Sequence, residues 1–303
     1  MEQNFETYLY NVVDAAKVQK DEPMKKHTTF RIGGPADYFI MPSNEKELEE
    51  TIRVCREFSI PIYIVGNGSN LLVGDKGFRG AIIQLYKSMG TFQVEGNQIT
   101  AQAGCSLAQI ANAALDAALT GFEFAAGIPG TLGGAVVMNA GAYGGEMKDV
   151  LTSVRVMTEE GEIMELPAEE LGLGYRTSII PEKRYIVLGA VISLTEGKKE
   201  EIKAQMDDLR QKRVSKQPLE YPSAGSTFKR PEGYFAGKLI QDSGLKGFTV
   251  GGAQVSEKHS GFVINKGNAT AADVMELIRQ VTAKVKEDTG VTMEPEVKQI
   301  GEF

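Results

Sequence analysis

The sequence of 303 residues is longer than a single hydrophobic core normally accommodates, so it predicts two or three domains. Its formal net charge of -7 and its pI near 5.2 disfavour a nucleic acid as partner, although a local basic pocket for one phosphorylated ligand stays open. Segment 1–20 has early acidic residues and no apolar run long enough for a secretory signal, so we expect a cytoplasmic protein outside the membrane.

The cysteines show no pattern typical of a disulfide or a metal site. Cys55 falls on an apolar stripe at helical spacing, Cys105 lies beside a glycine, and the chain has no C-x-x-C pair. Only His27 and His259 could add imidazole ligands. We therefore expect reduced thiols in or near the core and no metal.

The first part of the chain predicts short strands and two helices. We expect strands at 38–41, 62–65, 82–85, 92–94 and 99–103, with a hairpin turn at 95–97. Apolar residues recur at helical spacing from Leu48 to Phe58, and Pro61 ends that helix. Ser106 is expected to cap a second helix that closes at Gly121, with an apolar face of Leu107, Ile110, Ala114, Leu115 and Ala118.

A glycine-rich loop of sequence GNGSN, residues 66–70, follows the predicted strand 62–65. Backbone N–H groups and short polar side chains at a strand end can hold a phosphate. The loop is not G-x-G-x-x-G, because residue 71 is leucine, and G-x-x-x-x-G-K-[ST] occurs nowhere in the chain. Taken alone, this loop is equally compatible with a hairpin turn.

A second glycine-rich stretch runs from Phe124 to Gly145 without a charged side chain. Pro129, Asn139 and the repeated glycines make it a poor membrane-spanning helix. A tight turn packed on a strand would explain a few of these glycines, but it does not require so many. The stretch therefore favours close approach of a large flat ligand that carries a diphosphate.

The second half of the chain predicts a hairpin, further strands and two helices. Strands at 154–156 and 163–166 are joined by a turn at 159–161, and another strand spans 185–194. A charged amphipathic helix through Ile202, Met206 and Leu209 ends near Pro218, where a proline- and glycine-rich segment marks a domain boundary. Thr270 and Asp273 predict a capping box for a last helix that ends at Gly290, with Val274, Leu277, Ile278, Val281 and Val285 facing inward. The strand 294–300 is expected to return to an earlier region.

Three polar sites stand out in apolar or glycine-rich surroundings: Tyr175-Arg176 after GLG, Ser226 in PSAGSTFK, and Glu296 in MEPEVKQIG. Each is a weak signal by itself, because arginine, serine and glutamate usually lie on solvated surfaces or in turns. Together with GNGSN and GIPGTLGG…NAGAYG, in this order, they resemble the UDP-N-acetylenolpyruvoylglucosamine reductases, flavoenzymes of peptidoglycan precursor synthesis. The resemblance runs from about Thr29 to Gly301.

The resemblance implies an α+β protein with an FAD-binding fold like that of the vanillyl-alcohol oxidase and p-cresol methylhydroxylase group. A C-terminal α+β substrate-binding domain would follow. We expect one FAD-binding subdomain at 1–80, completed by 291–303, a second at 81–214, and the substrate-binding domain at 215–290. The short segments after Arg176 and Arg230 resemble the family's shorter structural type. FAD would be bound without a covalent link, NADPH would donate the hydride to a UDP-sugar substrate, and the protein would be a monomer.

The same resemblance assigns site residues. Arg176 and Glu296 would flank the reacting carbon, and Ser226 would donate the proton. Contacts with the substrate would come from Tyr143, Tyr175, Lys216 and Lys229. The residues expected to hold FAD are Ile64, Gly66, Asn67, Gly68, Ser69, Asn70, Ile128, Pro129, Gly133, Gly134, Val137 and Gly141.

Two positions depart from the family pattern. Lys298 stands where an arginine is expected two residues after the catalytic glutamate, so a bidentate contact is doubtful there. Arg230 stands where some members have asparagine, and a substrate contact is not assigned to it.

The predicted chemistry needs no histidine, and this agrees with the scarcity of histidine in the chain, which has only 2. Hydride passes from NADPH through the flavin to the enolpyruvyl carbon and leaves negative charge on the α-carbon and its carboxylate. Arg176 would stabilise that charge, worth about 3 to 4 kcal/mol, and Glu296 would donate a hydrogen bond if it stayed protonated. An ordinary alcohol such as Ser226 can protonate so basic a carbon.

Two other functions stay open from the sequence. One is a flavin oxidase on the same fold that uses oxygen as acceptor. The other is a nucleotide-sugar binding protein without flavin chemistry.

Overall fold

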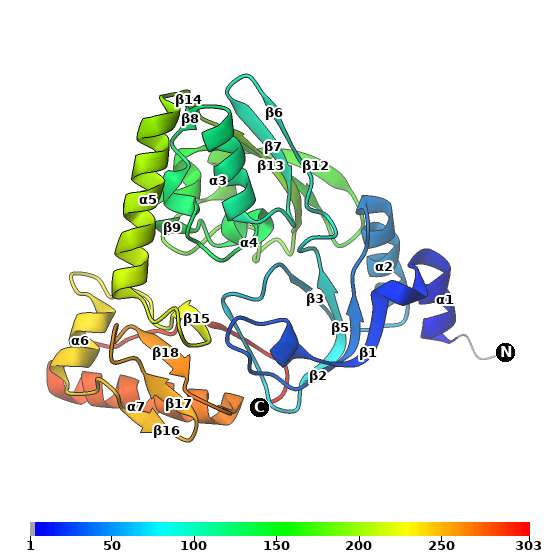
Figure 1. The fold of residues 1–303 in the computed structure, drawn as a ribbon. Helices are drawn as coiled ribbons and strands as arrows, with labels where there is room; N and C mark the ends of the chain where they lie inside the picture. The colour runs from blue at the N-terminus through cyan, green and yellow to red at the C-terminus, as the bar shows by residue number, and fades with distance from the viewer. Residues whose placement is uncertain (1–3) are drawn as a thin grey trace. The chain divides into compact units, whose positions relative to one another are not determined.

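The structure, a computed structural model, describes residues 4–303. Residues 1–3, which belong to the predicted N-terminal segment and to the predicted region 1–80, lie outside the described residues. The chain divides into two compact units (Figure 1). The first comprises the described residues of 1–19, 38–67 and 81–212, and the second comprises 20–37, 68–80 and 213–303. The three-region division that the sequence suggests stays a prediction.

A sheet of order β1-β2-β5-β3 contains the strands through which the chain passes from one unit to the other. Its strands are β1 (Val18–Pro23), β2 (Pro35–Ile40), β5 (Phe78–Gln84) and β3 (Ile62–Val65). Strands β3 and β5 are parallel, with Ile64 opposite Ile83. In the first unit, α1 (Phe5–Val12) contacts α2 (Glu45–Glu57), where Leu9 and Leu48 are fully buried.

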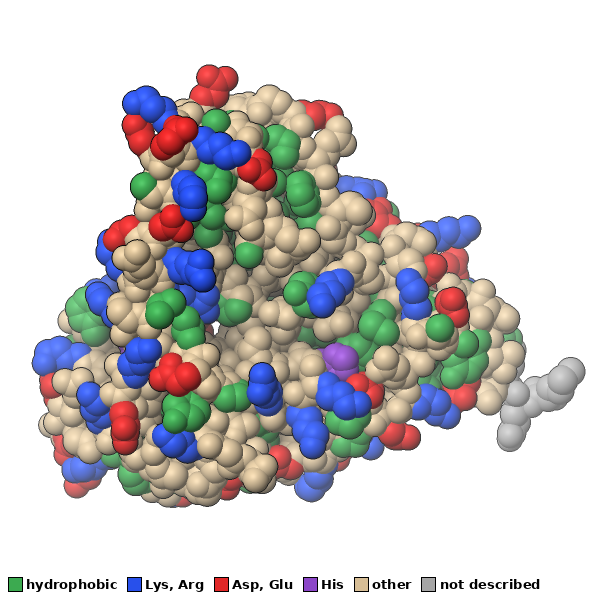
Figure 2. Space-filling view, in the orientation of Figure 1, with side chains coloured by type: hydrophobic (Ala, Val, Ile, Leu, Met, Phe, Trp, Pro, Cys, Tyr) green, Lys and Arg blue, Asp and Glu red, His purple; other side chains and the backbone are tan. Residues whose placement is uncertain are grey.

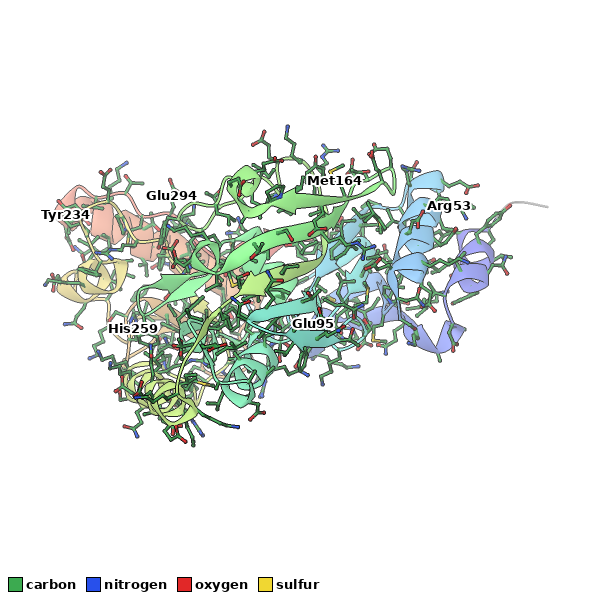
Figure 3. The ribbon with its side chains drawn as sticks, turned by 90° about the horizontal axis from the view of Figure 1, so that it is seen from above. Arg53, Glu95, Met164, Tyr234, His259 and Glu294 are labelled. Carbon is green, nitrogen blue, oxygen red and sulfur yellow. The ribbon has the colours of Figure 1, made fainter. Side chains whose placement is uncertain are left out.

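A five-stranded antiparallel sheet of order β12-β11-β13-β7-β6 forms the centre of the first unit. Its strands are β6 (Phe92–Glu95), β7 (Gln98–Gln102), β11 (Leu151–Met157), β12 (Ile163–Pro167) and β13 (Ile186–Ser193). Figure 3 shows its two edges, with Glu95 on β6 and Met164 on β12. Helices α3 (Leu107–Asp116) and α4 (Leu132–Val137) contact this sheet through β7, and α4 also contacts β13.

The second unit is built on a four-stranded antiparallel sheet of order β15-β18-β17-β16. Its strands are β15 (Ser223–Ser226), β16 (Thr249–Val250), β17 (Ala253–Val255) and β18 (Phe262–Asn265). Helix α7 (Ala271–Thr289) lies along this sheet (Figure 1), and α6 (Ala236–Asp242) contacts α7. The capping box of Thr270 and Asp273, the left-handed Gly290 and all five predicted inward residues of α7 are confirmed.

The closing strand β19 (Lys298–Ile300) pairs in parallel with β4 (Leu71–Val73). The C-terminal segment therefore does return to an earlier part of the chain, as expected. The other elements are β8 (Leu119–Thr120), β9 (Gly141–Ala142), β10 (Gly145–Glu146), β14 (Thr195–Glu196), α5 (Lys199–Lys216) and the 3₁₀ helices η1 (Ala15–Lys17), η2 (Met24–Lys26), η3 (Glu123–Ala125), η4 (Met147–Asp149) and η5 (Ala168–Leu171).

The predicted end of the helix after Ser106 is wrong. Ser106 does form a capping box with Gln109, but α3 ends at Asp116 and so includes neither Ala118 nor Gly121. Ala118 has a φ of +55°, a left-handed conformation that cannot continue an α-helix. The chain instead enters β8, which pairs with β14.

Strand β1 was not predicted, and the first strand was expected only at 38–41. Its sequence, VQKDEP, is mostly polar and ends in proline, so it lacks the apolar alternation of a half-buried strand.

The long uncharged stretch 124–145 folds into η3, α4, β9 and β10. Among residues 4–303, no helix combines the length and the apolar character that crossing a bilayer requires.

Both cysteines are buried and unbonded, as expected for core thiols. Burial raises the pKa of the Cys55 thiol to about 12 and that of Cys105 to about 11. Both thiols therefore stay protonated near neutral pH. Within the described part of the chain, no group of three or more His, Cys, Asp or Glu side chains could hold a metal ion.

Lysine and arginine side chains are interspersed with aspartate and glutamate on the face drawn in Figure 2. A nucleic-acid-binding surface typically gathers its basic residues into a stripe or patch. The face drawn has no such continuous stripe.

We predict that Thr270→Ala lowers the free energy of unfolding by about 1 kcal/mol, because the Asp273 N–H loses the hydroxyl that caps α7. Urea unfolding followed by circular dichroism measures the change. Thr292→Ala is the matched control, since Thr292 is exposed and its hydroxyl makes no hydrogen bond to the described residues. Equal destabilisation by both substitutions would contradict the capping role.

Candidate active site

The loop 66–70 joins β3 to β4 and presents unused hydrogen-bond donors. Among residues 4–303, no acceptor takes the backbone N–H of Asn67, Gly68 or Ser69. Gly68 is buried and has a φ of +61°. Buried N–H groups are normally paired, and consecutive N–H groups in such a turn form an anion-binding nest. The loop therefore fits the phosphate-binding role that the sequence suggests for it.

In the first unit, the start of this loop lies against the second glycine-rich stretch. The Asn67 side-chain amide donates to the carbonyl of Pro129 at 2.7 Å. A Cβ atom added to Gly66 would overlap the hydroxyl of Thr131, the residue that caps α4. Two motifs separated by about sixty residues are thus brought together, and the close approach requires glycine at residue 66.

In the second unit, the rest of the loop is fixed by two other segments. A Cβ atom added to Gly68 would overlap the carbonyl of His27, and the Thr29 N–H donates to the Gly68 carbonyl at 3.3 Å. The Asn70 side-chain amide donates to the carbonyl of Glu296 at 3.3 Å. The Lys298 N–H in turn donates to the Asn70 carbonyl at 2.9 Å. The predicted phosphate loop and the predicted catalytic glutamate are therefore linked through Asn70.

The predicted flavin-lining residues of the first unit include half-buried apolar side chains and open backbone. Ile64, Ile128 and Val137 are partly buried, and Pro129 and Gly134 are exposed. A Cβ atom added to Gly133 would lie 2.9 Å from the Cβ of Ala103, so that glycine lets α4 approach the strand region after β7. Gly134 has no such neighbour: its added Cβ would meet nothing closer than the Thr131 hydroxyl at 3.7 Å. Gly133 therefore serves packing, and Gly134 leaves backbone exposed.

Tyr143 lies at the tip of the two-residue hairpin that joins β9 to β10. Gly145 pairs with Ala142 and Glu146 pairs with Gly141 in this hairpin. Tyr143 has a φ of +53° and Gly144 a φ of +92°, and the tyrosine side chain is 48% exposed. A left-handed tyrosine is strained, and such strain is concentrated at functional sites. The geometry agrees with the predicted substrate contact.

Arg176 occupies a tight turn between Gly174 and Thr177. The Gly174 N–H donates to the Thr177 carbonyl at 3.2 Å, and the Thr177 N–H donates to the Gly174 carbonyl at 3.4 Å. Arg176 has a φ of +55°, and its Nη2 donates to the Gly141 carbonyl at 3.4 Å. Its guanidinium carbon lies 5.5 Å from the centroid of the exposed Tyr175 ring. This turn and the Tyr143 hairpin therefore lie together.

Ser226 ends β15 next to a β-bulge. Ser223 pairs with Ile264 and Ser226 with Phe262, so three steps along β15 oppose two along β18. Gly225, in the bulge, has a φ of +76°. A bulge shifts the alternation of side chains along a strand and can re-aim one of them. The Ser226 side chain is exposed, whereas the following Thr227 is buried.

Glu296 lies on the segment beside Ser226. The Glu296 N–H donates to the Thr227 carbonyl at 2.7 Å, and Phe228 forms a bridge with Pro295. The structure thus brings together two of the three predicted catalytic residues within the second unit. Arg176 belongs to the first unit, and its convergence with these two stays a prediction.

The predicted basic contacts differ in their surroundings. Lys229 forms an ion pair with Glu294 at 2.9 Å, next to the Glu296 segment, and Lys216 is exposed at the end of α5. The Arg230 guanidinium carbon lies 3.9 Å from the centroid of the Phe235 ring. Lys298 begins β19 with an exposed side chain.

Comparison with known proteins identifies the family. Residues 217–300 match the C-terminal domain of UDP-N-acetylenolpyruvoylglucosamine reductase, and residues 36–167 match an FAD binding domain. The chain is 55% identical to the UDP-N-acetylenolpyruvoylglucosamine reductase of Agathobacter rectalis, with 100% of both proteins covered. It is 56% identical to that of Caldanaerobacter subterraneus subsp. tengcongensis over 97% of each protein. The chain belongs to the UDP-N-acetylenolpyruvoylglucosamine reductase family.

A solved reductase structure of this family has the same fold. The crystal structure of the UDP-N-acetylenolpyruvylglucosamine reductase of Thermus caldophilus matches with a TM-score of 0.82 and 38% sequence identity, covering 94% of this chain and 99% of that one. The predicted family and the α+β fold with an FAD-binding part and a C-terminal reductase domain are confirmed.

His259 and Ser260 of this reductase-family chain were not selected from the sequence. The Thr227 N–H donates to the Gly261 carbonyl, so both residues lie close to β15. The Gly261 N–H donates to His259 Nδ1 at 3.1 Å, which leaves Nε2 to carry the proton of the neutral ring, and burial lowers the pKa of this histidine. The Ser260 hydroxyl is buried without a hydrogen-bond partner among residues 4–303. The closeness of His259 and Ser260 to β15 follows from the pairing of β15 with β18 and could not be predicted from the sequence.

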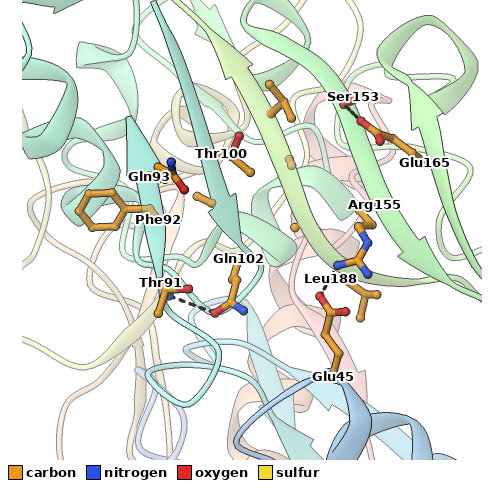
Figure 4. Close-up of a pocket in the computed structure, with 14 residues that line it drawn as sticks. Glu45, Thr91, Phe92, Gln93, Thr100, Gln102, Ser153, Arg155, Glu165 and Leu188 are labelled. Atoms are coloured by element: carbon orange, nitrogen blue, oxygen red, sulfur yellow. Dashed lines mark hydrogen bonds and ion pairs between the residues drawn. The ribbon is translucent and has the colours of Figure 1, made fainter. Parts of the chain in front are cut away.

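The predicted site residues do not line the hollow of about 430 Å³ on the five-stranded sheet. The side chains around it include Gln102, Ser153 and Arg155 (Figure 4). Arg155 is paired with Glu45, and Ser153 donates to Glu165. Because its charged groups already satisfy one another, this hollow is not our candidate site.

We predict that Gly68→Ala abolishes retention of FAD, because the new Cβ overlaps the His27 carbonyl and displaces the donors of the loop. Gly96→Ala is the matched control. Gly96 has a nearly equal φ of +58° but no atom within 4 Å of an added Cβ, so it incurs only the left-handed strain of about 1 to 2 kcal/mol. Flavin per polypeptide is read from visible absorbance of the purified variants. Equal retention by both variants would show that the Gly68 contact is unimportant.

Proposed function

We propose that this chain catalyses the NADPH-dependent reduction of the enolpyruvyl group of UDP-N-acetylenolpyruvoylglucosamine to UDP-N-acetylmuramate, a step of peptidoglycan precursor synthesis. The observation that carries the proposal is identity of 55% to a full-length reductase together with a Ser226 that lies beside Glu296. Reduction of the enolpyruvyl double bond consumes one hydride and one proton, and the serine is the proposed source of the proton.

FAD fits the residues that would hold it. The unpaired N–H groups of Asn67, Gly68 and Ser69 would bind its diphosphate, and Ile64, Ile128 and Val137 would contact its ring system. The open backbone at Gly134 allows a flat group to lie close to α4. When bound, FAD supplies two-electron chemistry, accepting a hydride from NADPH and delivering it to the substrate carbon.

Ser226 is proposed to protonate the α-carbon of the substrate. Ser226 is exposed at the end of β15, next to the bulge that contains Gly225. A carbon that carries the charge left by hydride addition is basic enough to take a proton from an alcohol. No histidine partner is needed for this step.

Arg176 and Glu296 are proposed to stabilise the negative charge on the substrate carboxylate. A guanidinium in a fixed turn is a preorganised donor, and loss of such a donor typically costs about 3 to 4 kcal/mol of transition-state stabilisation. Glu296 can donate a hydrogen bond to the same oxygens only when its carboxyl group is protonated.

Substrate binding is proposed to use exposed side chains on several elements. Tyr143 and Tyr175 would contact the sugar or the enolpyruvyl group, and Lys216 and Lys229 would neutralise phosphate or carboxylate groups. Lys229 would have to exchange its ion pair with Glu294 for the ligand. His259 adds a neutral N–H donor next to β15. We also propose that the protein works in the cytoplasm as a monomer.

A flavin oxidase on the same fold is the alternative within the same class. Anaerobic mixing with NADPH separates the two: rapid bleaching of the flavin absorbance supports the reductase, and bleaching only by an alcohol or sugar substrate supports the oxidase. A purified protein without flavin absorbance near about 450 nm would favour a nucleotide-sugar binding protein instead.

We predict that Ser226→Ala leaves reduction of the enzyme by NADPH unchanged and slows reduction of the enolpyruvyl substrate by about a hundred- to ten-thousand-fold. Stopped-flow absorbance measures the two half-reactions separately. Ser223→Ala, on the same strand, is the matched control, because its hydroxyl makes no hydrogen bond to the described residues. An equal loss in both half-reactions would reject the proton-donor role.

We predict the same division for Glu296→Ala, with the substrate step slowed by about a hundred- to a thousand-fold because one hydrogen-bond donor to the charged oxygens is lost. The substrate Kd, measured by flavin absorbance changes, should move much less. A loss confined to binding would contradict a role in the transition state, and a carboxylate shown to be ionised in the liganded enzyme would contradict the neutral donor.

A further inference from the structure

The Arg176 turn is held by a buried asparagine. Asn139 is 1% exposed, and its side-chain amide donates to the Gly174 carbonyl at 3.0 Å. Gly174 is the first residue of the turn that carries Arg176. Because Arg176 is left-handed, its conformation persists only if the surrounding contacts fix it. Asn139 supplies one of those contacts.

The same asparagine holds Glu146 on β10. Its amide donates to Glu146 Oε2 at 2.9 Å, and its Oδ1 accepts from the Lys148 N–H at 2.9 Å. Asn139 therefore uses both ends of its side chain, and it ties the Arg176 turn and the β10 strand to one point.

Glu146 and Arg176 both lie against Gly141 of the β9–β10 hairpin. Glu146 pairs with Gly141, and the Gly141 carbonyl accepts from Arg176 Nη2 at 3.4 Å. The Lys148 ammonium and the Asn139 amide hold the pKa of Glu146 below its usual value, and the charge of Arg176 adds to that effect. Glu146 is therefore anionic near neutral pH and attracts the guanidinium from a fixed position.

We propose that Glu146, anchored by Asn139, is a positioning residue that sets the orientation of the Arg176 guanidinium. The inference rests on the proposed function, in which Arg176 stabilises the charge on the substrate. Glu146 itself touches neither substrate nor cofactor in this proposal. Its effect on the reaction is transmitted entirely through Arg176.

A double-mutant cycle tests this role. Glu146→Gln keeps the size of the side chain and one acceptor oxygen for the Asn139 amide, but it removes the charge. We expect it to slow the substrate half-reaction on the order of tenfold, with the NADPH half-reaction and the substrate Kd changed less than about twofold. In an Arg176→Lys background, the same substitution should add less than about twofold, because the guanidinium that it orients is already gone.

Glu162→Gln is the matched control. Glu162 lies in the first unit, and its exposed side chain makes no ion pair with the described residues, so both half-reactions should match the parent enzyme. FAD content and the thermal midpoint of each variant show that it is folded. If Glu146→Gln does not retain FAD, Glu146→Ala with added acetate is used, and recovery of the substrate step by acetate is the expected result.

The outcomes separate the inference from the proposed function. Substitutions at Glu146 and Arg176 whose effects multiply independently, or a Glu146→Gln enzyme as fast as the parent, would overturn the positioning role while the reductase activity stands. The same holds if acetate fails to restore the substrate step. A parent enzyme that oxidises no NADPH in the presence of the enolpyruvyl nucleotide sugar would instead remove the proposed function.

Discussion

The N–H groups of the loop between β3 and β4 that have no acceptor among residues 4–303 are the constraint on which the candidate site depends. Three successive donors in this loop have no protein acceptor among residues 4–303, and one of them belongs to the buried Gly68. An unpaired buried donor costs about 1 to 3 kcal/mol. The loop is held in this conformation because Gly66 packs closely against Thr131 and Gly68 packs closely against the His27 carbonyl. The diphosphate that we propose for this loop would offset that cost, and its binding would therefore stabilise the loop.

Within the second unit, backbone pairing brings the segment of Glu296 beside Ser226, the residue that we propose as the proton donor. Residues 294–296 run beside 227–229, and the closing strand β19 pairs with β4 directly after the loop. The chain therefore has to place its last residues correctly before Glu296 can lie next to Ser226. A C-terminal strand with no core of its own thus has a direct effect on the proposed catalytic geometry.

Local signals predicted some elements well. Helix α7 begins with a capping box and ends at a left-handed glycine, and its buried face follows helical spacing, so its limits could be predicted from nearby residues. The end of α3 could not, because alanines favour continuation while pairing of β8 with β14 stops the helix. The glycine motifs indicated a ligand site, but the dependence of Gly66 on Thr131 and the links made by Asn139 are contacts between distant residues. No spacing in the sequence reveals them.

The left-handed backbone of Tyr143 limits how far the stability of the β9–β10 hairpin can be increased by substitution. Glycine or asparagine at the hairpin tip would adopt the left-handed backbone more easily, so selection for heat resistance alone would favour replacing the tyrosine. Such a change would remove the phenol ring from the surface that is proposed to meet the sugar nucleotide. With the substrate contact that we propose for Tyr143, thermal stability and turnover place opposite demands on this residue, and variants adapted to high temperature should gain their stability elsewhere.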